Sequence, residues 1–326
     1  MHIFKNPNYD FVRWRWHAIA LSWIIILGGL LYIRMSGGMP KGVEFEGGTI
    51  VILGFEQPTQ IDQVRNALAN GVPDGSNAIV QTYGSPSSNQ VMVRLRTAGA
   101  ESGGALSVTA DDVTAAVKRA NLGKFNVVGT RIVGPTVGAD LSRRGTLATV
   151  FALGGILIYV AFRFQFSFAV GAVVATLHDL LITLAFLAFF HYELSLNVIA
   201  AILTITGYSM NDTIVIFDRI RENMRSMRRD NLAHIVNVSV NQMLDRTLIT
   251  GGATMLSVIA LFIFGGEVLK GFAFTMIVGI ITGTYSSVFI AAAIVVIWQS
   301  RRTPKTAPAA VAPTTAPARK SRRRAS

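Results

Sequence analysis

Long apolar runs with few charged residues occur six times along the chain and predict six membrane-spanning helices. A helix needs about 20 consecutive apolar residues to cross the core of a bilayer. The first run is short, but Trp14, Trp16 and Tyr32 lie where interfacial aromatic side chains anchor a span. We therefore expect a retained helix there rather than a cleaved signal sequence. The predicted spans are residues 18–33, 145–162, 164–190, 194–217, 247–266 and 271–300.

The segment 34–144, between the first two spans, has the shorter periodicities of a folded α+β domain. Its order, βαββαβ, is typical of the ferredoxin-like unit. We therefore expect an α-helical polytopic membrane protein with six transmembrane helices and a ferredoxin-like domain between helices one and two. The predicted strands are residues 49–56, 78–83, 91–96 and 124–133, and the predicted helices are residues 59–70 and 109–121.

Lys and Arg residues gather in alternate connections, which predicts the orientation of the spans. Basic residues occur in residues 1–17, at Arg163 after the second span, in the connection 218–246 and in the tail 301–326. Short loops rich in Lys and Arg stay in the cytoplasm. The pattern therefore predicts that both termini are cytoplasmic and that the segment 34–144 is periplasmic. Arg143 and Arg144 oppose this orientation, but they end a long translocated segment, where the rule is weak.

The connection 218–246 alternates charged residues with apolar positions such as Ile220, Met224 and Val238. This spacing predicts an amphipathic helix that lies at the cytoplasmic surface of the membrane, with its arginines on the polar face. A simple positive-inside determinant would explain the arginines equally well, but it would not require the apolar positions.

The composition excludes several classes of protein. Of the 326 residues, 51% are hydrophobic and 15% are charged, against about 25% charged residues in soluble domains. The absence of cysteine excludes disulfides and thiolate chemistry. The segment 34–144 contains neither a phosphate-binding glycine loop nor a cluster of His and acidic residues at ligand spacing. We expect no catalytic centre, no metal site and no cofactor.

The net charge of +12 comes mainly from the tail 301–326, which holds eight basic residues and no acid. Its prolines, alanines and threonines cannot build a core, so we expect disorder. Anionic lipid is the favoured partner of this tail. Ribosomal RNA or an acidic protein remains an alternative, and nothing indicates a specific nucleic acid.

Two ionisable residues in or beside the apolar runs are candidates for function, because charges inside a membrane are costly. Asp212 interrupts the span 194–217, and Arg246 precedes the span 247–266. Since these spans are antiparallel, both residues are expected in the cytoplasmic half, where they could meet. By itself, an arginine at a span end more often extends its side chain to the interface. Asp212 is therefore the stronger candidate for a proton-binding site.

Polar residues at helical spacing extend from this pair. Hydroxyl side chains follow each other every three or four residues along the spans, and His178 stands next to Asp179 within the third one. The alternatives are that the hydroxyl groups only hold the helices together and that His178 and Asp179 form a structural pair. The candidate polar path comprises Thr204, Tyr208, Asn211, Thr250, Thr254, Asp179 and His178. The sixth span adds Thr275, Gly279, Thr282 and Ser286, and Gly279 and Gly283 form a GxxxG pair.

The chain also resembles the SecF family, the smaller half of the SecD/SecF complex and a branch of the resistance-nodulation-division superfamily. The resemblance covers most of residues 4–300. It rests on GVEFEGGT at 42–49, VGPTVGADL at 133–141, HDLLIT at 178–183, GYSMNDTIVIFDRIRENM at 207–224, RTLITG at 246–251 and FGGEVLKG at 264–271.

The resemblance implies a non-enzymatic subunit of the bacterial inner membrane, without an ATPase or hydrolytic centre. Such a subunit forms a heterodimer with SecD and uses the proton-motive force to promote preprotein export and release on the periplasmic side of SecYEG. SecA is an indirect partner, and YajC and YidC are further partners. The family's proton-relay carboxylate maps onto Asp212 and its arginine onto Arg246. The alternatives are half of a proton-coupled lipid or drug exporter, and a passive scaffold for SecD.

Overall fold

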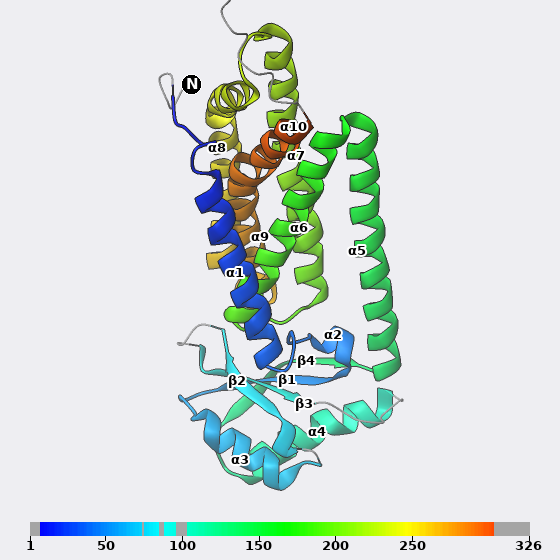
Figure 1. Cartoon of the computed structure of the whole chain (residues 1–326). Helices are drawn as coiled ribbons and strands as arrows, with labels where there is room; N and C mark the ends of the chain where they lie inside the picture. Colours follow the sequence, from blue (N-terminus) through cyan, green and yellow to red (C-terminus); the bar gives the residue numbers. More distant parts are fainter. Residues whose placement is uncertain (1–6, 74, 85–87, 96–102, 303–326) are drawn as a thin grey trace, which may run out of the picture.

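The computed structural model describes residues 7–73, 75–84, 88–95 and 103–302. A bundle of long helices stands on a small α/β domain, and the first and last described helices have their outer ends at the far end of the bundle from that domain (Figure 1). The tail that is expected to be disordered begins at residue 301, but Arg301 and Arg302 still belong to the last helix. Residues 303–326 lie outside the described residues.

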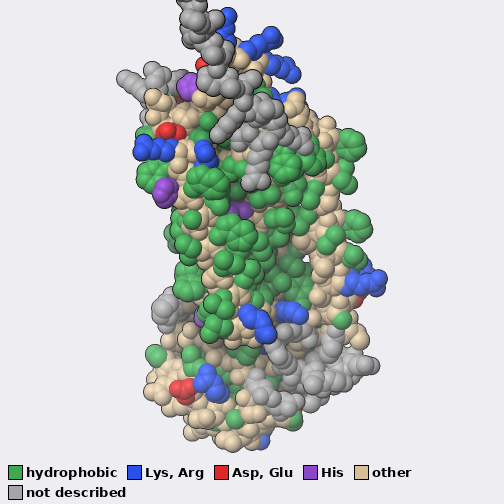
Figure 2. Space-filling view, viewed as in Figure 1, with side chains coloured by type: hydrophobic (Ala, Val, Ile, Leu, Met, Phe, Trp, Pro, Cys, Tyr) green, Lys and Arg blue, Asp and Glu red, His purple; other side chains and the backbone are tan. Residues whose placement is uncertain are grey.

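Six helical segments are long and apolar enough to cross a membrane, as the sequence predicts. The last segment is one span built from two α-helices and a wide turn of π-type between them. The segments are α1 (Arg15–Met35), α5 (Pro135–Arg163), α6 (Phe166–Phe189), α7 (Leu196–Ser226), α8 (Leu232–Phe264), and α9 (Gly266–Ser286) with the turn Ser287–Ala291 and α10 (Ala292–Arg302). On the face shown in Figure 2, hydrophobic side chains form a broad belt across the bundle.

The helices differ in how deeply they are buried. Within the apolar window of each helix, 67% of the last span and 56% of α6 are buried, against 17% of α8 and 6% of α5. The last span is therefore central, whereas α5 and α8 lie outside. Close contact between α9 and α7 depends on small residues, since a Cβ on Gly279 would lie 2.4 Å from Ile205 Cδ1 and one on Gly283 would lie 2.8 Å from Ser209 Cβ.

The connection 218–246 differs from the expected amphipathic helix on the membrane surface. α7 continues to Ser226 and α8 begins at Leu232, so two long antiparallel helices are joined by a short turn. Ile220 packs with Val236 and Val240 in one cluster, and Met224 packs against it. The apolar positions therefore face the neighbouring helix rather than lipid, which explains why their periodicity resembles that of a surface helix.

The small domain follows the predicted βαββαβ order. Its strands form one antiparallel sheet in the order β2-β3-β1-β4. The elements are β1 (Gly48–Phe55), α3 (Ile61–Gly71), β2 (Ile79–Tyr83), β3 (Gln90–Leu95), α4 (Gly103–Arg119) and β4 (Phe125–Val133). Two short helical segments that the sequence analysis did not predict are α2 (Val43–Glu46) and the 3-10 turn Gly75–Asn77.

Side chains alternate along β1, so the two faces of the sheet pack in different clusters. Val51 and Leu53 pack with Val64 of α3 and Val113 of α4, forming the core of the domain. Ile50 and Ile52, on the opposite face, belong to a smaller cluster. In Figure 1, α3 and α4 cover the face that is turned away from the bundle.

The joint between the domain and the bundle is held by the turn between α6 and α7. Arg94 of β3 is 3% exposed and donates to Glu193 Oε1 at 2.5 Å and to the backbone oxygen of Lys41. Leu194 donates to Pro40 O at 2.7 Å, and Gly42 donates to Leu194 O at 2.8 Å. The turn between α6 and α7 is therefore tied directly to the sheet and to the segment before it.

Candidate functional site

Asp212 lies on α7 inside the bundle, as predicted, and is 9% exposed. The Thr247 hydroxyl of α8 donates to its Oδ1 at 2.8 Å. Its Oδ2 is buried and has no hydrogen-bond partner among the described residues. An oxygen of a buried carboxyl group that lacks a hydrogen-bond partner is costly, which makes Asp212 an unusual group inside the bundle.

Arg246, the predicted partner of Asp212, is exposed and forms no ion pair with it within the described part of the chain. The expectation that the two residues meet is therefore wrong for this conformation. α8 instead turns Val240, Thr247, Gly251 and Val258 toward the bundle. Thr247 takes the place expected for Arg246, because adjacent helical residues point about 100° apart.

The buried pair His178 and Asp179 of α6 forms a second polar centre. His178 Nδ1 lies 2.9 Å from Asp179 Oδ1. Ser209 of α7 and Ser286 of α9 donate to Asp179 Oδ2 at 2.5 and 2.8 Å. Both oxygens of this carboxylate are thus satisfied, by groups from three helices.

The network continues from His178 to α1. His178 Nε2 lies 2.7 Å from the Ser22 hydroxyl. Tyr285 of α9 stacks on the imidazole with ring centroids 6.0 Å apart, and its hydroxyl donates to Ala18 O at 2.7 Å. Ser22 Oγ lies 3.3 Å from the same hydroxyl. Four helices therefore meet at one chain of polar groups.

The remaining residues of the candidate polar path do not join these centres directly. The hydroxyls of Thr204, Thr250 and Thr254 donate to backbone oxygens of their own helices. The Tyr208 hydroxyl faces Gly251 of α8, and Asn211 is exposed. These residues instead form a polar strip along the α7–α8 side of the bundle.

The sequence analysis did not assign a role to several residues that complete the two centres. Ser22, Ser209 and Thr247 carried no separate signal, because single hydroxyl residues are common in membrane helices. For Thr247 a signal exists in retrospect, since Val240, Thr247, Gly251 and Val258 recur at steps of seven, four and seven. The wide turn after Ser286 also places Ser287 2.8 Å from Thr213.

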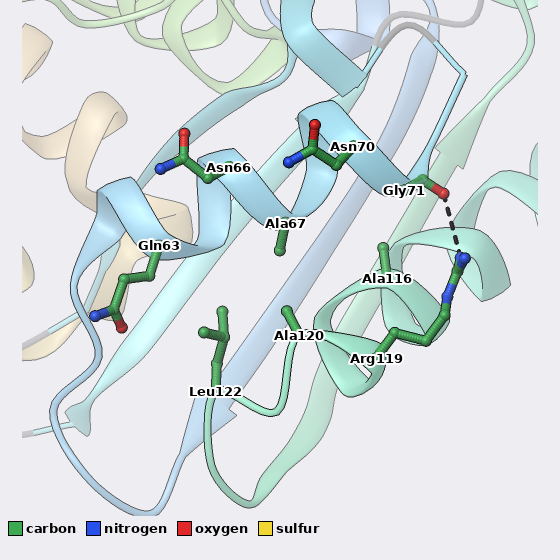
Figure 3. Close-up of a pocket in the computed structure, with 9 residues that line it drawn as sticks. All are labelled: Gln63, Asn66, Ala67, Asn70, Gly71, Ala116, Arg119, Ala120 and Leu122. Atoms are coloured by element: carbon green, nitrogen blue, oxygen red, sulfur yellow. Dashed lines mark hydrogen bonds between the residues drawn. The ribbon is translucent and has the colours of Figure 1, made fainter.

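A separate cavity lies between α3 and α4 on the outer side of the small domain (Figure 3). Its volume is about 540 Å³, and amide side chains of Gln63, Asn66 and Asn70 line one wall. Arg119 donates to Gly71 O at 3.2 Å across its end. Its described lining holds no acid, histidine or nucleophile, and no group of three or more metal-ligating side chains occurs among the residues that the structure describes.

Comparison with known proteins gives consistent results. The family model described as "Protein export membrane protein SecD/SecF, C-terminal" matches residues 112–301. The chain is 36% identical to a protein translocase subunit SecF from Koribacter versatilis, covering 93% of this chain and 94% of the relative. It is 40% identical to the SecF subunit of Escherichia coli O157:H7, covering 88% and 86%, and 42% identical to that of Vibrio alginolyticus, covering 89% of each.

The fold is also similar to that of solved structures. A crystal structure of SecDF, a translocon-associated membrane protein from Thermus thermophilus, matches with a TM-score of 0.79 and 32% identity. The match covers 91% of this chain but 39% of the SecDF chain. SecDF in a super-membrane-facing form matches with a TM-score of 0.64 and 34% identity, covering 92% and 40%. The chain belongs to the SecF family of protein translocase subunits and is a multi-pass membrane protein.

Proposed function

We propose that this chain is the proton-driven, non-enzymatic accessory subunit of a bacterial Sec translocase. It acts with SecD in the inner membrane to promote export and release of preproteins on the periplasmic side of SecYEG. Asp212 supports this proposal best, because it is a buried carboxylate with one hydrogen-bond donor and one oxygen without a described partner. Such a group can change its protonation state or its partner without breaking a complete network.

In this mechanism Asp212 alternates between a protonated form bound to Thr247 and an ionised form paired with Arg246. A rotation of α8 by up to about 100° would exchange Thr247 for Arg246, since the two are adjacent on one helix. Moving one charge across the membrane supplies about 2.3 kcal/mol per 100 mV, comparable with the free energy that separates conformers of a hinged protein.

The bundle also supports SecD as the partner. Thr204, Asn211, Arg246 and Thr250 are exposed on α7 and α8. A charged side chain facing lipid is costly, so we propose that helices of SecD cover this polar strip. The match to 39% of the SecDF chain agrees with this view, because the rest of that longer chain is available to supply the missing half.

The orientation follows from the basic residues at the end of the bundle away from the small domain. Arg219, Arg221 and Arg225 lie in the last turns of α7, and Arg163 ends α5. By the positive-inside rule this end and both termini are cytoplasmic, and the small domain is periplasmic. Movement of α6 and α7 then reaches the periplasmic sheet through Arg94 and Glu193.

The test is preprotein export into membrane vesicles that contain the full chain and SecD, with and without an imposed proton gradient. In Asp212→Asn the stimulation by the gradient is expected to fall at least tenfold, while the complex with SecD still assembles. Asp218→Asn is the matched control, because Asp218 lies on the same helix but forms an exposed ion pair with Arg163. Unchanged export in Asp212→Asn would refute the relay and favour a passive scaffold. Gradient-driven transport of a lipid or drug without preprotein would favour an exporter.

A further inference from the structure

The chain before α1 is bound along the first turns of α8, at the end of the bundle away from the small domain (Figure 1). Asn241 Oδ1 accepts from Tyr9 N at 2.9 Å, and Asn241 Nδ2 donates to Tyr9 O at 2.8 Å. One turn earlier, Asn237 Oδ1 accepts from Phe11 N at 2.9 Å. Since the two asparagines are four residues apart, they lie on one face of α8. This face holds the main chain of residues 9–12, which we call the N-terminal strap.

The strap also contacts parts of the bundle other than α8. The ring of Phe11 lies edge-on to that of Phe289 in the wide turn of the last span, with centroids 5.5 Å apart. Val12 is buried in the apolar cluster at this end of the bundle. α1 begins at Arg15, three residues further on. The strap therefore ties α8 to the last span and to α1.

The other polar contact of this part of α8 is made with α7. Asn223 of α7 donates to Ser239 Oγ and to Gln242 Oε1, both at 2.8 Å. These bonds can follow a joint movement of α7 and α8, whereas the bonds to the strap cannot. Five of the eight buried residues of α8 lie between positions 235 and 241, where the strap and α7 make these contacts. The rotation of α8 is therefore set mainly by its first turns.

We propose that Asn237 and Asn241 are positioning residues of the Asp212 site, which act through the strap to keep Thr247, rather than Arg246, turned toward the carboxylate. The inference rests on the exchange of partners proposed above. A rotation of α8 by about 100° moves each Cα by about 3.5 Å, since helical Cα atoms lie about 2.3 Å from the axis. Bonds of 2.8–2.9 Å to an anchored main chain cannot follow that displacement. The exchange therefore requires that the strap separate from α8.

The experiment is disulfide formation between two introduced cysteines in the complex of the full chain with a cysteine-free SecD. The chain has no cysteine of its own, so each pair reports on one contact. Asp212→Cys with Thr247→Cys reports the present rotation, and Asp212→Cys with Arg246→Cys reports the exchanged one. The first pair is expected to react at least fivefold faster, because the Thr247 hydroxyl lies 2.8 Å from the Asp212 carboxylate. Equal rates would mean that α8 is not held in one rotation, and would overturn the proposal.

Loss of the two asparagine side chains should change the ratio of these two rates. In Asn237→Ala with Asn241→Ala, the ratio is expected to fall at least threefold, because the first pair slows and the second accelerates. A merely structural role would loosen the bundle and change both rates in the same direction. Asn197→Ala is the matched control, because this asparagine also bonds to a backbone group, Val268 O, but at the opposite end of α7. An unchanged ratio in the double variant would refute the positioning role.

A second variant weakens the strap and leaves α8 unchanged. Phe11→Ala removes the ring that contacts Phe289 and Tyr9. The ratio is expected to fall in the same direction, by about half as much as in the asparagine variant, and assembly with SecD shows that the chain is folded. If only the asparagine variant shifts the ratio, the asparagines act within α8, and the role of the strap is refuted.

The disulfide rates separate this inference from the proposed function, since they are measured without preprotein or proton gradient. A ratio that depends on the strap supports the inference even if export in Asp212→Asn is normal, and then the relay alone is refuted. A ratio that does not depend on the strap refutes the inference, and loss of gradient-driven export in Asp212→Asn would still support the relay.

Discussion

The two buried carboxylates of the bundle have opposite environments. Asp179 lies on α6, which is largely buried, and it receives hydrogen bonds from Ser209, Ser286 and His178. Asp212 lies at the contact with the outer helix α8 and receives one hydrogen bond, from Thr247. One carboxylate is thus enclosed by the chain itself, and the other is left incomplete.

The difference in hydrogen bonding between Asp179 and Asp212 indicates which of the two sites can rearrange. A satisfied buried network holds helices in one arrangement, since every change leaves several polar groups unpaired. An incomplete site costs stability but can exchange partners at little further cost. The bundle therefore combines a fixed centre, which ties α1, α6, α7 and α9 together, with a changeable one at its edge.

The largest expected effect is on stability and separates the two carboxylates. Asp179→Ala leaves His178, Ser209 and Ser286 without their partner, and we expect a loss of about 3 kcal/mol, typical of a broken buried pair. Asp212→Ala frees Thr247 alone, so the loss should be about 1 kcal/mol or less. Unfolding of the SecD complex in a titration with SDS measures both. Equal losses would mean that the difference in hydrogen bonding has no energetic weight.

The second effect is the contribution to stability of each hydroxyl group that donates to Asp179. Ser209→Ala and Ser286→Ala each remove one hydroxyl, and we expect a loss of about 1 kcal/mol for each, within the range found in membrane helices. In the background of Asp179→Ala the same substitutions should have little effect, because their acceptor is gone. A double-mutant cycle measures this coupling. Independent effects in both backgrounds would contradict a shared network.

The sequence predicts the two carboxylates better than their partners. Asp212 and Asp179 stand out because a charge within a long apolar run must be buried or functional. Arg246 was predicted as the partner of Asp212 from its depth and from the family resemblance, and neither fixes the rotation of a helix in one conformation. The buried positions Val240, Gly251 and Val258 show which face of α8 packs against the bundle, and Thr247 lies on that face.

The fold was equally predictable where one local pattern decides it. Six apolar runs and the βαββαβ order correspond to the observed elements. The connection 218–246 was not predicted correctly, because a stripe of apolar residues is the same whether it faces lipid or a second helix. In the structure Ile220 packs on Val236 and Val240, so the stripe faces a second helix. A contact between two separate helices cannot be inferred from the periodicity within one of them.

A third and smaller effect concerns the one donor of Asp212. Thr247→Val keeps the shape of the side chain and removes its hydroxyl, which should cost about 1 kcal/mol and leave both carboxyl oxygens without a described donor. Under the proposed relay, it should also favour pairing with Arg246 and change the response of export to the gradient. Thr247→Ser, which keeps the hydroxyl, is the control. If the response of export to the gradient is the same in Thr247→Val as in the wild type, Thr247 plays no part in the exchange of partners at Asp212.

The smallest effect is expected at Thr250, which lies about one helical turn after Thr247 on α8. The Thr250 hydroxyl donates to Arg246 O at 2.9 Å and to Thr247 O at 3.2 Å, both within its own helix. Thr250→Val should therefore change stability by less than about 0.5 kcal/mol and gradient-driven export by less than twofold. Ser257→Ala, further along the helix and bonded in the same way to Ala253 O, is the matched control. If Thr250→Val abolished the response to the gradient while Ser257→Ala did not, protons would pass along the polar strip itself, and the changeable site would extend beyond Asp212 and Thr247.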